Sequence, residues 1–293
     1  MNKCDVINVL MTEVSERFGG RRVELKTVTK NNGVEMNGIA IEMEAYDNIS
    51  ATVYVDDIVE LIMNGDITYN DAVNNIIKTY DGAQKPDFVG ETNFMDVLTN
   101  KEKLLSRVHR NLISKELNKD CMGEFPHKEF CDLLIVYRVK VSDEATTRIT
   151  NALMDTLGLT LEEIDEAARK NDKDIWKAIS MGDMLRSTGN DFGYDAMLDV
   201  FMQIITNEDG RYGAASITDP EFMEKMAEKY NGDFYIIPCS IHECILLPGM
   251  MGSDVGALRT MVGSVNSEEL APGDILSDSV YFYNSTTKTV EKA

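Results

Sequence analysis

Long hydrophobic runs are missing from this sequence of 293 residues. The longest apolar stretches, such as Leu133 to Tyr137, fall far short of the roughly 20 residues that a membrane-spanning helix needs. The first residues, Met1 to Asp5, contain no apolar segment of the kind found in a secretory signal peptide. We therefore expect a cytoplasmic protein that does not associate with a membrane.

Cysteine is also sparse. The chain has five cysteines, an odd number spread widely along the sequence, which is not the dense pattern of a secreted, disulfide-stapled domain. They are Cys4, Cys121, Cys131, Cys239 and Cys244. A reducing compartment with free thiols is the expectation.

Positive charge is scarce relative to negative charge. Aspartate and glutamate number 50 and lysine and arginine number 29, which gives a formal net charge of −21. Direct nucleic-acid binding is disfavoured, because affinity for a phosphate backbone depends on lysine and arginine displacing counterions. The charge fits an ordinary soluble acidic protein, and it also fits an acidic mimic of nucleic acid that covers a basic groove.

What the chain does contain is patterned for both helices and strands. Asn31-Asn32-Gly33 separates two alternating segments, which predicts a hairpin. Leu133 to Val139 predicts a central strand, and Asp219-Pro220 predicts the start of a helix. Helices and strands do not alternate strictly, so we expect an α+β fold with a mainly antiparallel sheet, flanking helices and a division into two lobes.

The segment Asp81 to Pro86 predicts a linker, because glycine and proline interrupt the periodic pattern there. It divides the chain into a helix, hairpin and helix lobe at 1–82 and an α+β domain at 87–293. Within the second, strands are expected at 201–205 and 212–217. The polar region 172–193, which holds Trp176, is expected to be a mobile insertion, an interaction surface or a loop pinned by the tryptophan.

The richest chemistry lies in the stretch from Cys239 to Cys244, between two predicted strands. It offers two thiols, a hydroxyl, the imidazole of His242 and the carboxylate of Glu243. Zinc needs about four nitrogen or sulfur ligands, and Cys239, His242 and Cys244 could supply three if the turn folded them inward. Structural packing is the simpler interpretation, since strand alternation works against such a cluster.

A second stretch, Phe125 to Val136, echoes the first, with His127 leading into an apolar strand. An enzyme that uses His242, Glu243 and His127 in one cleft is therefore an alternative. The sequence has only three histidines and contains no nucleophile elbow, zinc-protease helix or P-loop. No catalytic constellation is assigned, and no cofactor is expected.

The run Gly232-Asp-Phe-Tyr-Ile-Ile-Pro-Cys-Ser-Ile-His-Glu243 resembles the hallmark of a family of uncharacterised proteins from anaerobic gut bacteria, whose members often sit near mobile-element genes. The resemblance implies a domain of unknown function and no particular activity. His242 and Glu243 fit that family pattern. Cys239 and Cys244 depart from it, since serine and an aliphatic residue stand at those places, and the departure weakens the zinc interpretation.

These observations favour a non-enzymatic cytoplasmic protein that binds a protein partner and has a link to mobile elements. A small hydrolase or metal-dependent enzyme using His242 and Glu243 is the first alternative, and an acidic nucleic-acid mimic is the second. His242 is expected to be structural, satisfying backbone groups of its turn.

Overall fold

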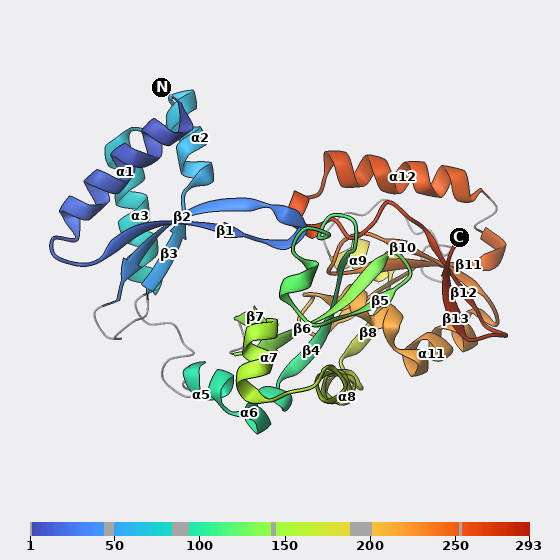
Figure 1. Cartoon of the computed structure of the whole chain (residues 1–293). Helices are drawn as coiled ribbons and strands as arrows, with labels where there is room; N and C mark the ends of the chain where they lie inside the picture. Colours follow the sequence, from blue (N-terminus) through green and yellow to red (C-terminus); the bar gives the residue numbers. More distant parts are fainter. Residues whose placement is uncertain (1, 44–49, 84–93, 142–144, 188–200, 252–253) are drawn as a thin grey trace. The chain divides into compact units, whose positions relative to one another are not determined.

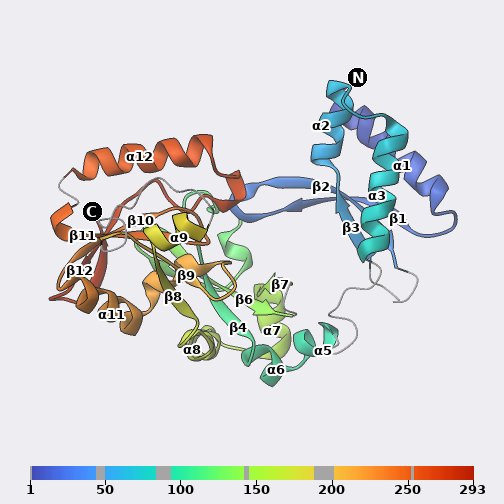
Figure 2. The same cartoon turned by 180° about the vertical axis from the view of Figure 1, so that it is seen from behind.

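The computed structural model describes residues 2–43, 50–83, 94–141, 145–187, 201–251 and 254–293 (Figures 1 and 2). The fold is α+β with antiparallel sheets, which confirms the predicted class. Two compact units are present: unit 1 extends to Glu91 without Asn31–Gly33, and unit 2 comprises Asn31–Gly33 and Thr92–Ala293. No helix in the described ranges has both the length and the apolar character required to cross a bilayer.

Unit 1 packs three helices on a three-stranded sheet with the order β1-β2-β3. Its elements are α1 (Lys3–Arg17), β1 (Val23–Thr29), β2 (Glu35–Glu42), β3 (Ser50–Tyr54), α2 (Asp56–Asn64) and α3 (Tyr69–Ala83). The predicted hairpin is confirmed, since β1 pairs with β2 from Val23↔Ile41 to Thr29↔Glu35. Asn32 adopts a φ of 61° in the turn, which asparagine tolerates better than most residues.

Unit 2 contains two further sheets. The strands are β4 (Val108–Ser114), β5 (His127–Phe130), β6 (Leu133–Lys140), β7 (Thr146–Arg148), β8 (Trp176–Ser180), β9 (Gln203–Asn207), β10 (Phe234–Pro238), β11 (Cys244–Pro248), β12 (Tyr281–Asn284) and β13 (Thr289–Lys292). One sheet has the order β4-β6-β5, with β7 also on β6, and the other has the order β13-β12-β10-β11-β9-β8. The predicted central strand is confirmed, because β6 pairs on both sides.

Helices cover these sheets. They are α5 (Phe94–Thr99), α6 (Lys101–Leu105), α7 (Asn151–Leu157), α8 (Leu161–Asp172), α9 (Met181–Ser187), α11 (Pro220–Tyr230) and α12 (Val255–Glu268), with 3-10 turns η1 (Asn31–Gly33), η2 (Met122–Glu124), η3 (Gly213–Thr218), η4 (Gly249–Met251) and η5 (Pro272–Asp274). Asp219 caps α11 through the backbone N–H of Phe222, as the Asp-Pro pair predicts.

The main core of unit 2 lies between its two sheets. Side chains of β4 and β6 meet those of β9, β10, β11 and β12 there, together with α8, η3 and α11. Alternation in β6 places Leu133, Ile135 and Tyr137 in this core and Leu134 and Val136 in a smaller cluster on the opposite face. The next residues on that opposite face of β6 are Arg138 and Lys140, and the packing of the preceding residues fixes the strand that carries them.

Three local expectations need correction or comment. The strand predicted at 212–217 is wrong, because Tyr212 has a φ of 61° and the chain then turns into η3. Trp176 is only 9% exposed and begins the edge strand β8, so this part of 172–193 is integral to the sheet, while residues 188–193 lie outside the described ranges. The predicted linker begins within α3, which continues to Ala83, and residues 84–86 are also outside the description.

Candidate functional site

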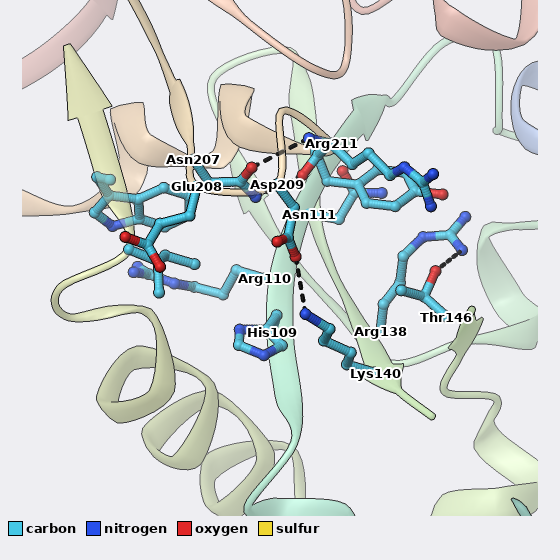
Figure 3. A pocket seen from close by; sticks show the side chains of 13 residues that line it. His109, Arg110, Asn111, Arg138, Lys140, Thr146, Asn207, Glu208, Asp209 and Arg211 are labelled. Atoms are coloured by element: carbon cyan, nitrogen blue, oxygen red, sulfur yellow. Dashed lines mark hydrogen bonds and ion pairs between the residues drawn. The ribbon is translucent and has the colours of Figure 1, made fainter. Parts of the chain in front are cut away.

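A cavity of about 140 Å³ lies in unit 2, where β4 and β6 meet the start of β8 and the segment 207–212 after β9 (Figure 3). We call it the basic pocket. Five basic residues line it, and two acidic residues, Glu208 and Asp209, do so as well. The basic residues are His109, Arg110, Arg138, Lys140 and Arg211. Such a surplus is notable in a chain with a net charge of −21.

Strand register concentrates this charge. In the antiparallel pairing, His109 lies directly opposite Arg138, and Arg138 lies directly opposite Arg148 of β7. Directly paired residues point to the same face, so three basic side chains form a row across three strands. The guanidinium groups of Arg138 and Arg148 carry like charges, which repel in such positions and destabilise a sheet. An anion between them would reverse that effect.

One of the arginines is fully neutralised by the protein. Arg110, with 1% of its side chain exposed, donates from Nε to Oδ2 of the fully buried Asp172 over 2.8 Å. Its Nη1 donates to the carbonyl of Thr218 over 3.2 Å, and its Nη2 lies 3.3 Å from Oδ2 of Asp219. Asp219 also accepts from Nε1 of Trp176, and Asp172 is 2.9 Å from Nδ1 of His109. This is a satisfied buried ion-pair network that fixes β4 against α8 and α11.

Arg138 is different. No carboxylate in the described ranges forms an ion pair with it, and its Nε is buried without a hydrogen-bond partner there. Its Nη1 lies 3.4 Å from Oγ1 of Thr146, and the guanidinium lies 4.5 Å from the ring centre of Tyr212. Burial lowers the pKa of Arg138 from its usual value. A partly buried charge that lacks a counterion is unfavourable, so an anion bound beside Arg138 would stabilise it.

Asn111 lies on the same face of β4 as His109, two residues further along the strand. It is only 1% exposed and lines the basic pocket, yet neither Oδ1 nor Nδ2 has a hydrogen-bond partner in the described ranges. Its register partner is Val136, so Arg138 is its diagonal neighbour on β6. Buried amides are normally hydrogen-bonded. An unpaired donor and an unpaired acceptor are thus directed at the same cavity as Arg138.

Segment 207–212 forms the opposite wall (Figure 3). The Asn207 side chain closes it by donating to the carbonyl of Arg211 and accepting from the Arg211 backbone N–H, over 2.6 and 3.1 Å. Lys140 lies 3.0 Å from Oδ2 of Asp209, which ties the wall to β6. Tyr212 ends the segment in the left-handed region, an unusual conformation for a bulky residue.

His242 lies behind this wall, in the turn between β10 and β11. Its Nδ1 accepts the backbone N–H of Tyr212 over 3.0 Å, and the two rings lie 5.4 Å apart. Its Nε2 is 3.5 Å from Oδ1 of Asp274, and about a third of its side chain is exposed. The strongest sequence candidate thus contacts the basic pocket indirectly, through Tyr212.

The other residues of the turn are placed for packing. Cys244 is fully buried in the main core, and burial raises the pKa of its thiol. Burial, aided by the charge of Glu243, raises the pKa of the Cys239 thiol to about 12. The Glu243 carbonyl accepts the backbone N–H groups of Cys239 and Ser240. Cys239, His242 and Cys244 do not form a metal-binding group, and none with three or more such ligands occurs in the described ranges.

His127 lies on β5, in a different sheet from the His242 turn. Its Nδ1 donates to the carbonyl of Phe125 over 3.0 Å, and the two rings pack edge to face. The resemblance between the two sequence stretches therefore reflects two separate strand entries with different partners.

Sequence reasoning missed Arg138 and Asn111. The available signal was the polar run from His109 to Asn111 in β4, and the basic residues Arg138 and Lys140 at the end of the apolar strand β6. Neither strand alone indicates a site, because the polar residues of β4 and the basic residues of β6 become neighbours only through the strand register.

Comparison with known proteins identifies a family for this chain but no activity. Searches of curated proteins and of solved structures found no match to the chain. A family model, described as a family of unknown function (DUF5688), matches residues 4–285. This match spans both units and includes every residue of the basic pocket. The chain therefore belongs to this family of unknown function.

Proposed function

We propose that this chain is a binding protein that takes a small oxyanion in the basic pocket. The observation that carries the proposal is the pair formed by Arg138, partly buried without a carboxylate partner in the described ranges, and Asn111, buried with an unpaired amide, on one face of β4 and β6. Arginine and amide N–H groups are the donors that carboxylate and phosphate oxygens accept. One anion would stabilise both side chains.

The contrast between Arg110, which is buried, and Arg138, which is partly buried, supports the same conclusion. Arg110 lines the same cavity and has Asp172 and Asp219 as its counterions. The fold therefore supplies carboxylates, one of them fully buried, beside an arginine whose charge is structural. Arg138 has no carboxylate partner within the described residues, which fits a charge that a ligand neutralises.

The experiment uses the only tryptophan of the chain, Trp176, which lines the basic pocket. Sodium acetate and sodium phosphate are titrated at constant ionic strength while Trp176 fluorescence is recorded. We expect saturable binding of at least one anion with a millimolar Kd or tighter, and at least tenfold weaker binding by Arg138→Gln.

Arg186→Gln is the matched control. It removes one positive charge from an exposed position on α9, half of whose side chain is in solvent, and does not line the pocket. It should bind like the parent. Absence of saturable binding, or equal affinity of Arg138→Gln and the parent, contradicts the proposal.

The finer predictions from sequence stay proposals beside this one. They are a protein partner, a link to mobile elements, a cytoplasmic location and an origin in gut bacteria. The hydrolase alternative has less support, because Nδ1 of His242 already accepts the Tyr212 N–H and is not free to act as a base as placed. The mimic alternative predicts carboxylate rows, whereas the face built here by β4, β6 and β7 carries a basic row.

A further inference from the structure

The unpaired amide of Asn111 limits the chemistry of the ligand. A neutral amide offers two N–H donors and an oxygen acceptor. Carboxylate or phosphate oxygens can accept from Nδ2, but a bare anion leaves Oδ1 without a donor. Because Oδ1 is also buried and unpaired, the complementary ligand carries an N–H or O–H group beside its anionic group.

The spacing of the two residues limits where that donor sits. Asn111 pairs with Val136 and Arg138 follows two residues later, so the two are diagonal neighbours on adjacent strands. Such positions are roughly 7–8 Å apart at the backbone, within reach of long side chains. A group that contacts both side chains is therefore small, with the donor close to the anion.

The charge around the cavity limits the donor further. An ammonium group next to the anion would lie near the guanidinium of Arg138, whose register partner on β7 is a second arginine, Arg148. The two acidic residues of the lining do not offset it, since Asp209 pairs with Lys140 and Glu208 pairs with Lys177. A neutral N–H or O–H donor fits this environment better than a free amine.

Resting on the proposed function, we propose that the ligand is a carboxylate with a neutral N–H or O–H donor on its α-carbon. Arg138 binds the carboxylate, with which a guanidinium forms paired hydrogen bonds, and Asn111 accepts the α-donor through Oδ1. This chemistry occurs in an N-acyl amino acid, in a 2-hydroxy acid and at the C-terminal residue of a peptide. Ile175, Trp176 and Tyr212 line the apolar part of the cavity beside it.

The test compares N-acetylglycine with N-acetylsarcosine, which differ by replacement of the amide hydrogen with a methyl group. Binding is followed by Trp176 fluorescence, and lactate against propionate provides a second pair that differs in a hydroxyl. We expect the donor-bearing member of each pair to bind at least fivefold more tightly to the parent. Arg138→Gln should weaken all four acids at least tenfold.

Asn111→Leu removes both polar atoms at similar size and should abolish the difference within each pair while the remaining affinity persists. If this variant does not fold, the two ligand pairs on the parent protein still decide the matter. N-acetyl-glycyl-glycine then separates the sources: tighter binding than N-acetylglycine indicates a peptide end, and equal binding indicates a free small acid.

Failure of this inference is distinguishable from failure of the proposed function. Equal affinity within both pairs, together with Arg138-dependent binding of acetate or phosphate, overturns the α-donor and leaves an oxyanion-binding protein. No saturable binding of any of these anions overturns both.

Discussion

The backbone N–H of Tyr212 donates a hydrogen bond to Nδ1 of His242 over 3.0 Å. This contact joins the turn between β10 and β11 to the wall of the basic pocket. Tyr212 has a φ of 61°, which a bulky side chain rarely adopts without support, and its ring lies over the Arg138 guanidinium. We infer that His242 stabilises the conformation that places Tyr212 over Arg138.

His242→Ala should lower both stability and affinity. Loss of one partly buried hydrogen bond is worth about 1 kcal/mol. For a unit of this size that corresponds to a decrease in Tm of about 2–4 °C, measured by Trp176 fluorescence. N-acetylglycine should bind several-fold more weakly, because the Tyr212 wall is less firmly held.

Glu243→Ala is the comparison for that variant. Its backbone carbonyl, which accepts two hydrogen bonds in the turn, is retained, so the change in Tm should be smaller. If His242→Ala melts at or above the parent temperature, the structural role of His242 is wrong.

Arg110→Gln should lower stability strongly, whereas Arg138→Gln should not lower it. Arg110 neutralises Asp172, which is fully buried, and removing one partner of a buried ion pair is expected to lower the unfolding free energy by about 3–5 kcal/mol. Arg138 has no such partner in the described ranges, so its removal relieves an uncompensated charge and should leave stability unchanged or raise it by up to about 2 kcal/mol. Urea unfolding of both variants without ligand measures the two effects. A large loss of stability in Arg138→Gln would mean that the residue is structural.

The fold was largely predictable because its signals are local. The Asn31–Gly33 turn, the Asp219 cap and the apolar run of β6 each express a preference of a few neighbouring residues, and each is present in the structure. The conformation of Tyr212 could not be predicted in this way, since a tyrosine side chain does not itself favour a positive φ. The support comes from His242, thirty residues away.

The basic pocket was not predictable for a related reason. Its members come from β4, β6 and segment 207–212, and their meeting depends on strand register and on how one loop closes. The sequence drew attention to cysteine and histidine, whose chemistry is recognisable by type. Arg138 and Asn111 are ordinary residue types, and they become notable only because Nε of Arg138 and both amide atoms of Asn111 are buried without hydrogen-bond partners in the described ranges.

Asp165 should make stability depend on pH in the acidic range. Burial acts to raise the pKa of this carboxyl, but hydrogen bonds from Lys128, Arg169 and Tyr137 outweigh it and hold the pKa below its usual range. A lowered folded-state pKa contributes stability that is complete above the unfolded pKa of about 3.9 and is lost as the pH falls through the folded value. Asp165→Asn should therefore be about 1.5–3 kcal/mol less stable at pH 7, with the deficit shrinking below about pH 4.

The matched control for that variant is Glu166→Gln, at an exposed position of the same helix, α8. Its stability should follow the parent across the range. Urea unfolding at pH 3, 5 and 7 provides the comparison. A deficit for Asp165→Asn that is constant from pH 3 to pH 7 would show that the charge of Asp165 does not stabilise the fold.

Gly213→Ala tests whether the wall of the basic pocket depends on close backbone contact. A Cβ at this position would lie 2.5 Å from the backbone nitrogen of Asn207 and against Thr206, whose hydroxyl donates to the His242 carbonyl. Neither neighbour is the end of a flexible side chain, so segment 207–212 must shift. We expect a loss of about 1–3 kcal/mol in unfolding free energy, typical of overpacking, and weaker binding of N-acetylglycine, because Tyr212 moves with the segment.

Gly123→Ala is the control, since no atom lies within 4 Å of the added carbon, and its unfolding free energy should stay within about 0.5 kcal/mol of the parent value. Parent-like stability and binding in Gly213→Ala would mean that the wall can move without affecting the pocket, and the positioning role given to His242 and Tyr212 would then be wrong.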